Sequence, residues 1–336
     1  MTVVEPFGLS VRGQALEADV QTGLAAVEAG LLKATKSEVP FITEAAQHLV
    51  RAGGKRFRPL LVMLAAQFGD PYAPGIVPAA VVVELTHLAT LYHDDVMDEA
   101  EVRRGVDSAN ARWGNSAAVL TGDFLFARAS HIVADLGPEA VRIQAEAFER
   151  LVTGQILETA GPRDGRDPVD HYLDVIGGKT GSLIAVSGRF GAMMSGADEA
   201  VVDILTQYGE RLGVAFQLAD DVLDIGSDTH ESGKTPGTDL REGVATLPVL
   251  LLRAQAEAHG LPDDLALVEL LDGDLADDAR HAEVLRRLRA HPALEQARRD
   301  TVRYAEEARS TLTPLPECYA KSALVELCDA VVHRAG

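Results

Sequence analysis

The chain has 336 residues, 47% of them hydrophobic and 24% charged, and its formal net charge is −20. This acidic balance argues against a nucleic-acid partner, because phosphate backbones bind basic surfaces. The first residues lack the basic start and apolar segment of a signal peptide, and no uninterrupted apolar run approaches the roughly 20 residues of a membrane span. Cys318 and Cys328 are too few for a zinc site and too far apart on one helix for a disulfide. We therefore expect a cytoplasmic protein without a transmembrane segment.

Hydrophobic residues recur with helical spacing along nearly the whole chain, and Gly, Pro and Asp separate the segments. No convincing strand pair is visible. The pattern predicts helices over 14–36, 41–52, 56–69, 75–99, 115–136, 138–160, 168–178, 180–196, 198–225, 244–258, 274–290, 292–311 and 315–333. One all-α domain covering residues 1–336, a bundle of about thirteen helices, is the simplest arrangement. The irregular, glycine-bearing stretch 226–243 is interpreted as a lid, with a mobile connector as the alternative.

Two aspartate-rich motifs stand out, LYHDDVMDEAEVRRG at 91–105 and QLADDVLDI at 217–225. In each, two aspartates four residues apart share a helix face and a third lies about 100° round the helix. The six are Asp94, Asp95, Asp98, Asp220, Asp221 and Asp224. Two carboxylates 5 Å apart repel by about 3 kcal/mol at an effective dielectric near 20, so six that converge require bound cations. Oxygen ligands favour Mg²⁺, which bridges carboxylates to phosphates. Either motif alone could be an exposed helix end, but their recurrence favours a magnesium site.

Basic residues near these motifs indicate an anionic ligand. GGKRFRP (53–59) places three cations behind two glycines at a helix start, where backbone N–H groups and the helix dipole also favour an anion. Arg103 and Arg104 follow the first aspartates, and guanidinium groups match phosphate oxygens. GGKT (177–180) is weak evidence, since an ordinary interhelical turn explains it equally well. The spacing of His87 alone favours a core histidine.

Taken together, GGKRFRP, HDDVMDEAEVRRG, GGKTGSL, FQLADDVLD and GKTPGTDL resemble the trans-isoprenyl diphosphate synthase (polyprenyl synthetase) family across roughly residues 45–250. The resemblance implies an isoprenoid synthase fold, with helices around a central cavity, and a homodimer. It also implies a Mg²⁺-dependent prenyltransferase. Such an enzyme condenses isopentenyl diphosphate with an allylic diphosphate into an all-trans polyprenyl diphosphate.

The resemblance also implies roles for single residues. The Mg²⁺ ligands would be Asp94, Asp98 and Asp220, with Asp95, Asp221 and Asp224 as further or outer ligands. Isopentenyl diphosphate would meet Lys55, Arg58, His87 and Arg104. The allylic diphosphate would meet Arg103, Lys179 and, from the lid, Lys234, while Gln217 and the carbonyl of Thr180 would face the developing cation. Val244 stands where many members carry a second lysine, so one allylic contact is absent.

Product length is predicted from the helix that carries Asp94, where Thr90, Ala89, Thr86 and Val82 would line the path of the growing chain. In the family, a bulky aromatic at the place of Ala89 or Thr90 stops growth at short products. One helical turn rises about 5.4 Å, close to one prenyl unit. The small residues here therefore predict roughly seven or more units, as in quinone side chains. Phe124 and Phe126 are candidates for the end of the path. Alternatively, Ala89 only lets two helices pack closely, and the product is farnesyl or geranylgeranyl diphosphate.

Two other functions are considered. A terpene cyclase shares the helical bundle and one aspartate motif, but it usually carries an Asn/Ser/Glu triad in place of the second motif and lacks GGKRxRP. A non-catalytic subunit of a heteromeric synthase loses aspartates or arginines, and none is missing here. Both alternatives fit this sequence less well than a synthase does.

Overall fold

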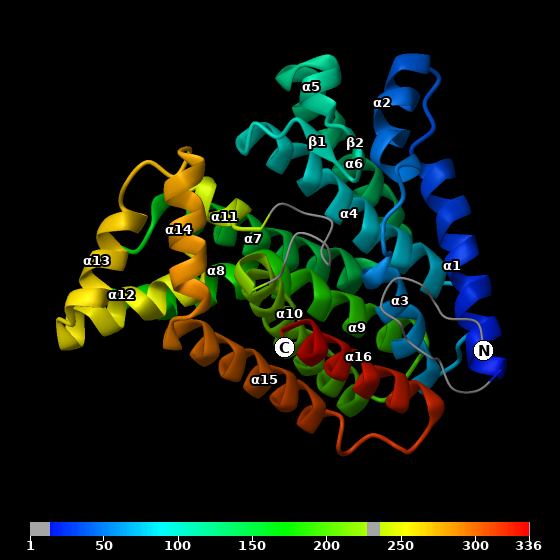
Figure 1. The fold of residues 1–336 in the computed structure, drawn as a ribbon. Coiled ribbons are helices and arrows are strands. Elements are labelled where there is room, and N and C mark those ends of the chain that lie inside the picture. The colour runs from blue at the N-terminus through cyan, green and yellow to red at the C-terminus, as the bar shows by residue number, and fades with distance from the viewer. Residues whose placement is uncertain (1–13, 227–235, 336) are drawn as a thin grey trace. The chain divides into compact units, whose positions relative to one another are not determined.

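The computed structural model describes residues 14–226 and 236–335 and is all-α, as predicted (Figure 1). Short helical turns η1 (Ala66–Phe68) and η2 (Gly177–Gly181) accompany the α-helices. The α-helices are α1 (Gln14–Ala34), α2 (Pro40–Arg51), α3 (Phe57–Ala65), α4 (Ile76–Met97), α5 (Ala109–Trp113), α6 (Asn115–Asp135), α7 (Pro138–Ala160), α8 (Pro168–Ile176), α9 (Ser182–Met194), α10 (Glu199–Gly226), α11 (Thr238–Arg241), α12 (Leu247–His259), α13 (Pro262–Leu271), α14 (Asp278–Arg289), α15 (Pro292–Thr311) and α16 (Tyr319–Ala335).

Each predicted helix has a counterpart, but about thirteen helices is too low a number for the described residues. Helices α5, α11 and α13 have no counterpart among the predicted segments. The first two are only five and four residues long, too short to show a helical period. Helix α13 begins at Pro262; proline separates helical segments in the sequence pattern, but it is also favoured at the first position of a helix.

The expectation of no strand pair was also wrong. Strands β1 (Val102–Arg103) and β2 (Val106–Asp107) pair antiparallel, with Arg103 opposite Val106. The two residues between them, Arg104 and Gly105, have φ values of 55° and 77°, as the two central residues of a type I′ hairpin turn require. Two-residue strands are too short to show alternation, so this hairpin leaves no periodic signal in the sequence.

The chain divides into two compact units. Unit 1 comprises Met1–Arg150, Ser182–Gly209 and Thr311–Glu326, and unit 2 comprises Leu151–Gly181, Glu210–Ser310 and Leu327–Gly336. The expectation of a single domain stays a prediction.

Helix α4 is the centre of unit 1 and contacts α1, α3, α6 and α9 (Figure 1). It is apolar on nearly every side, and a helix of that kind is stable in water only when it is buried. The hydroxyl of its Tyr92, which is fully buried, donates to the carbonyl of Ala45 at 2.6 Å and so ties α4 to α2. Gly191 of α9 lies so close to the carbonyl of Val62 that an added Cβ would come within 2.3 Å of it. Small residues thus let α3 and α9 approach closely.

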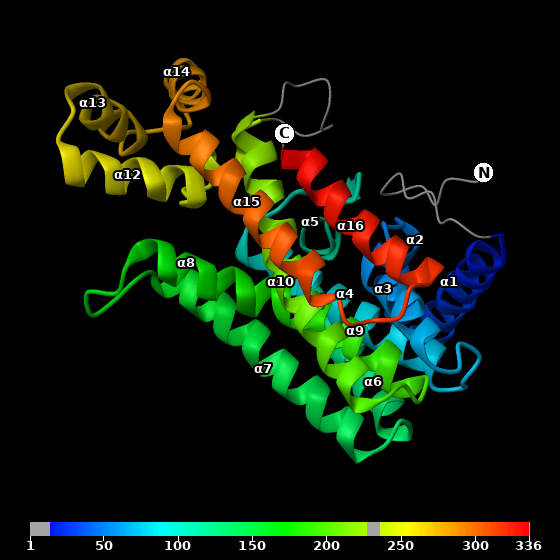
Figure 2. The ribbon, with the colours of Figure 1, turned by 90° about the horizontal axis from the view of Figure 1, so that it is seen from below.

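In unit 2, α8 lies beside the last turns of α7, and α12 contacts both α8 and α13 (Figure 2). A ring nitrogen of His171 lies 3.1 Å from the carbonyl oxygen of Leu157, which links α8 to α7. Helix α8 starts with Asp167, whose carboxylate accepts from the N–H groups of Val169 and Asp170. These contacts fix the start of α8 and hold it beside α7.

Two of the described helices, α4 and α6, are long and apolar enough to cross a membrane by length and composition alone. The core helix of a soluble protein passes the same test, and 72% of the relevant window of α4 is buried inside the structure. In α6 the buried share is 33%. The absence of a transmembrane segment stays a prediction.

Candidate active site

A buried carboxylate organises several cations in unit 1. Glu84 of α4 is 2% exposed, and its Oε1 atom lies 3.0 Å from a guanidinium nitrogen of Arg56 and 3.8 Å from one of Arg104. Arg56 also pairs with Glu28 and donates to the carbonyl of Val50, so protein groups occupy its donors. Arg56 is therefore a structural residue, although the sequence placed it among the phosphate-facing cations. Glu84 was missed, and the signal was a single acidic residue inside the apolar run VVVELT.

The hairpin turn holds Arg104 against the end of α2. Its guanidinium donates to the carbonyl of Leu49 at 3.1 Å and to that of Gly53. A Cβ added to Gly54 would lie 2.8 Å from the central carbon of this guanidinium, so a larger residue here would displace the guanidinium. Gly54 has a φ of 150°, which side chains rarely adopt. Gly54 thus gives the Arg104 guanidinium its room, Gly53 contributes a carbonyl acceptor, and Lys55 lies exposed between α2 and α3.

Arg58 and His87 lie within the same cationic group. Burial lowers the pKa of Arg58 to about 10, and the charge of Arg104 lowers it further, while Glu84 opposes the shift. The Nε atom of Arg58 is buried without a hydrogen-bond partner among the described residues. The pKa of His87 is lowered well below its ordinary value, first by burial and then by the charges of Arg58, Arg104, Arg103 and Arg56. The ring of His87 is therefore neutral in the free protein, and the cluster carries more positive charge than Glu84 balances.

The first aspartate motif occupies the last turn of α4. Asp94 is half-buried, Asp95 is 0% exposed, and Asp98 caps the end of the helix and is exposed. The Nε atom of Arg103 lies 2.5 Å from Oδ1 of Asp95, and the Arg103 guanidinium comes within 4.0 Å of Asp98. Burial raises the pKa of Asp95, although Arg103 opposes the shift. Within the described residues, the other oxygen of Asp95 is buried and accepts no hydrogen bond.

The residues of the predicted product path lie along α4, and most of them are buried. Ala89, Thr86 and Val82 are almost fully enclosed, whereas Thr90 is half-buried and its hydroxyl donates to the carbonyl of His87. A Cβ added to Gly122 of α6 would lie 3.0 Å from the carbonyl oxygen of Ala89. This close approach supports the view that Ala89 lets α4 and α6 pack together, and it leaves Thr90 as the more accessible position. Phe126 stacks on Phe148 with ring centroids 4.1 Å apart.

The second aspartate motif lies in unit 2 and carries a hydrogen-bonded chain of side chains. Asp221 is buried, accepts from the hydroxyl of Tyr172 at one oxygen, and accepts from the amide nitrogen of Gln217 at the other, at 3.0 Å. The amide oxygen of Gln217 accepts from the hydroxyl of Thr180 at 3.0 Å. Burial raises the pKa of Asp221 to about 7, while the bonds from Tyr172 and Gln217 oppose the shift. Tyr172 was not predicted, because a tyrosine on an amphipathic helix carries no distinctive signal.

Asp224 and Lys179 each contact a neighbouring segment of unit 2. The carboxylate of Asp224 accepts at 3.2 Å from the backbone N–H groups of Thr238 and Asp239, the first residues of α11. Lys179 lies in the single π-helical turn η2 that joins α8 to α9, and π-turns inside helices are frequent at functional sites. Its ammonium group lies 2.6 Å from the carboxylate of Glu158. The GGKT segment is therefore a helical π-turn rather than an ordinary interhelical turn.

The predicted site residues thus fall into two groups, one in each unit. Unit 1 holds Lys55, Arg58, His87, Ala89, Thr90, Asp94, Asp95, Asp98, Arg103 and Arg104, and unit 2 holds Lys179, Thr180, Gln217, Asp220, Asp221 and Asp224. Lys234 lies outside the described residues, and Val244 is exposed after α11. Within the part of the chain that is described, no three His, Cys, Asp or Glu side chains are gathered so that they could hold a metal ion by themselves.

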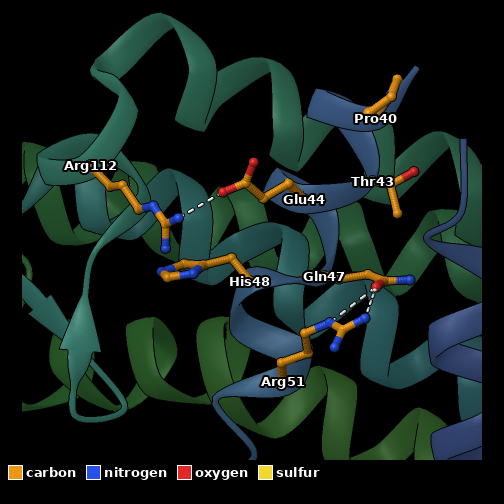
Figure 3. Close-up of a pocket in the computed structure, with 7 residues that line it drawn as sticks. All are labelled: Pro40, Thr43, Glu44, Gln47, His48, Arg51 and Arg112. Carbon is orange, nitrogen blue, oxygen red and sulfur yellow. Dashed lines mark hydrogen bonds and ion pairs between the residues drawn. The ribbon is translucent and has the colours of Figure 1, made fainter.

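A separate groove of about 470 Å³ lies between α2 and α5 (Figure 3). Its lining residues are Pro40, Thr43, Glu44, Gln47, His48, Arg51 and Arg112. Arg112 pairs with Glu44 at 2.7 Å, and Arg51 donates twice to the amide oxygen of Gln47. None of the predicted site residues lines this groove.

Comparisons with known proteins agree with the motifs. A family model described as polyprenyl synthetase matches residues 39–286. The nonaprenyl diphosphate synthase of Mycobacterium tuberculosis is 47% identical over 330 residues, which cover 98% of this chain and 97% of that protein.

Two solved structures are similar along nearly the whole chain. One is a geranylgeranyl pyrophosphate synthase from Corynebacterium glutamicum complexed with calcium and isoprenyl diphosphate. Its TM-score is 0.87 at 45% identity, over 98% of this chain and 100% of that one. The other is a decaprenyl diphosphate synthase from Rhodobacter capsulatus. Its TM-score is 0.86 at 36% identity, over 96% of this chain and 99% of that one. With a family model that spans well over half of the sequence and relatives that cover nearly all of it, this chain belongs to the polyprenyl synthetase family.

Proposed function

We propose that the chain is a prenyltransferase that condenses isopentenyl diphosphate, head to tail, with an allylic diphosphate to form an all-trans polyprenyl diphosphate. The observation that carries this proposal is the cationic cluster of unit 1, beside a helix that ends in three aspartates. Arg58 and Arg104 leave an excess of positive charge around the neutral ring of His87. A diphosphate would compensate that charge, and guanidinium groups match its oxygens.

The donor set fits a hard divalent cation. Mg²⁺ is commonly held by one or two carboxylates, with water and substrate phosphates completing its ligands, so no ready-made cage of three side chains is needed. In unit 1, Asp94 and Asp98 would provide such carboxylates, and in unit 2, Asp220 would provide one. The buried oxygen of Asp95 that no donor among the described residues reaches is consistent with a cation nearby. When bound, Mg²⁺ would stabilise the negative charge that gathers on the departing diphosphate. The calcium in the Corynebacterium glutamicum structure is a divalent cation with the same preference for oxygen.

The chain's own residues would stabilise both ends of the breaking bond. Ionisation of the allylic C–O bond leaves negative charge on diphosphate and positive charge on carbon. Arg103 in unit 1 and Lys179 in unit 2 would each offer a cation to diphosphate oxygens, and preorganised charges of this kind lower the barrier most. The amide oxygen of Gln217 and the carbonyl of Thr180 would face the allylic cation. The double bond of isopentenyl diphosphate then attacks that carbon, and the released diphosphate takes up the proton that is lost.

We propose a long-chain product. Thr90 and Ala89 are small, so no aromatic side chain blocks the path one turn before Asp94. The nonaprenyl and decaprenyl diphosphate synthases among the relatives support this choice. The similarity to a geranylgeranyl pyrophosphate synthase, at 45% identity, keeps a shorter product as the second candidate.

We also propose that the protein works in the cytoplasm as a homodimer. Support comes from α6, an apolar helix of which only 33% of the most apolar window is buried. Its Leu120 is 66% exposed. A second copy would cover this face, and light scattering after size-exclusion chromatography measures the oligomeric state. Leu120→Asp should shift a dimer towards monomer, whereas a monomeric wild type would contradict the proposal.

The activity is tested by incubating the purified protein with isopentenyl diphosphate, farnesyl diphosphate and Mg²⁺. We expect both substrates to be consumed, with no consumption once EDTA has removed the metal. A cyclic hydrocarbon formed from farnesyl diphosphate alone would show a terpene cyclase instead. No reaction at all would indicate a non-catalytic subunit.

A further inference from the structure

Four polar side chains of unit 2 form one continuous hydrogen-bonded chain. The order is Thr180 to Gln217 to Asp221, with Tyr172 on the far side of the Asp221 carboxylate. Tyr172 and Asp221 are both buried, and they lie on different helices, α8 and α10. Tyr172 is the member of this hydrogen-bonded chain farthest from Thr180, and it contacts neither substrate nor metal in the proposed reaction.

The chemistry of these groups fixes which way the amide of Gln217 points. Both oxygens of the Asp221 carboxyl group act as acceptors in the structure, one from the Tyr172 hydroxyl and one from the Gln217 amide nitrogen, so the amide turns its nitrogen rather than its oxygen toward Asp221. The amide oxygen must then point away from Asp221, and there it meets the hydroxyl of Thr180 as a donor. If the amide were flipped, its oxygen would face the Asp221 carboxyl oxygen, and the hydrogen bond between the two residues would be lost. The carbonyl dipole of Gln217 is therefore directed by Asp221.

Tyr172 in turn determines where the Asp221 carboxylate lies. Its hydroxyl donates to the Asp221 oxygen that Gln217 does not use, so donors from α8 and α10 hold both oxygens. Without this donor, one oxygen of a buried carboxylate would lose its partner. The carboxylate could then rotate about its last side-chain bond, and Gln217 would rotate with it.

We infer that Tyr172 is a positioning residue, which acts through Asp221 to aim the carbonyl oxygen of Gln217 at the carbon that becomes positive. This inference rests on the proposed prenyl transfer, because only a reaction that forms a cation uses such a dipole. It predicts a specific kinetic signature. The dipole matters in the transition state and hardly in the ground state, so its loss lowers kcat and leaves KM nearly unchanged.

The test compares Tyr172→Phe with Tyr208→Phe. Tyr208 is also a buried tyrosine, on the same helix as Gln217, and its hydroxyl donates to the carbonyl of Leu324 at 2.7 Å, away from the hydrogen-bonded chain. The rate of the first condensation is measured in a single turnover with farnesyl diphosphate. We expect Tyr172→Phe to lower it about ten- to a hundredfold, the factor that one hydrogen bond to a charged group carries. Both KM values should stay within about twofold, and Tyr208→Phe should keep the wild-type rate.

A double substitution separates positioning from general support of the fold. In a Gln217→Ala background there is no amide to aim, so adding Tyr172→Phe should cost less than about twofold more. The same loss in both backgrounds would overturn the inference, because it would show that Tyr172 acts independently of Gln217. A wild-type rate in Tyr172→Phe would overturn it as well. A wild-type protein that consumes no isopentenyl diphosphate would overturn the proposed function and this inference together.

Discussion

The Nε atom of Arg103 lies 2.5 Å from Oδ1 of Asp95, which is fully buried at the end of α4. The sequence placed these residues in separate roles, one as a diphosphate ligand and one as a further metal ligand. Their contact shows that Asp95 holds the β-hairpin, and with it Arg103, against α4. Breaking a buried pair of this kind by removing one partner leaves an uncompensated charge. Asp95 therefore fits an outer role, and Asp94 and Asp98 remain the candidates for direct metal contact.

Asp94→Ala should lower kcat by at least about a hundredfold, because the loss of one group that stabilises charge in the transition state has an effect of that size. The variant should still fold, because Asp94 is only half-buried and its removal leaves no cavity in the core. Asp203 is an exposed aspartate of α10, so Asp203→Ala serves as the control and should keep full activity. Asp220→Ala should behave like Asp94→Ala, and near-normal turnover in either would contradict the metal proposal.

Arg104→Ala should raise the KM for isopentenyl diphosphate about ten- to a hundredfold and that for the allylic substrate much less. The reason is the loss of about 1.5–3 kcal/mol from one charge-assisted contact. Lys55→Ala should act in the same direction. Steady-state kinetics with each substrate varied in turn measures both constants. An effect confined to the allylic substrate would show that the two diphosphate sites are exchanged.

Gly54→Ala tests the proposed contact between Arg104 and isopentenyl diphosphate without removing a charge, since the new methyl group would collide with the Arg104 guanidinium. Gly54→Ala should therefore raise the KM for isopentenyl diphosphate, as Arg104→Ala does. Gly53→Ala is a matched control, because Gly53 also has a positive φ but an added Cβ there would meet no atom within 4 Å. If the two variants have equal KM values, backbone strain rather than Arg104 explains the effect.

His87 should make the free protein less stable in mild acid. Its pKa is lowered well below the ordinary 6.5, so below that pH the unfolded chain binds a proton that the folded chain does not. Stability then falls as the pH decreases from 6.5, by at most about 1.4 kcal/mol per pH unit. Urea unfolding at pH 7.5 and 5.0 should show a smaller acid loss in His87→Gln than in the wild type. An equal loss in both would mean that His87 titrates normally.

Thr90→Phe should shorten the product to a few isoprene units while the first condensation continues, since an aromatic ring would block the path one turn before Asp94. Ala89→Phe should shorten the product too, but at a cost in stability, because Ala89 is enclosed and its carbonyl lies beside Gly122. Mass spectrometry gives product length, and thermal unfolding gives stability. Unchanged length in both variants would place the gate elsewhere.

The sequence predicted the all-α fold and thirteen helices, because long apolar periods and Gly/Pro boundaries are local signals. It could not predict the β-hairpin, which depends on positive φ values at Arg104 and Gly105. Motifs and family resemblance supplied the candidate residues. The partners of those residues depend on tertiary packing and had no local signal. Three contacts are of this kind: Arg104 with Glu84, Tyr172 with Asp221, and Asp224 with the first N–H groups of α11.

The most direct test of the proposed function is the mass spectrum of the products that the purified wild type makes from isopentenyl diphosphate, farnesyl diphosphate and Mg²⁺. We expect linear diphosphates that differ by whole isoprene units and end at roughly seven or more units, since neither Thr90 nor Ala89 places an aromatic side chain one turn before Asp94. A cyclic hydrocarbon, or isopentenyl diphosphate left unconsumed, would contradict the proposal of a chain-elongating prenyltransferase. A series that stops at about four units would contradict only the long-chain product.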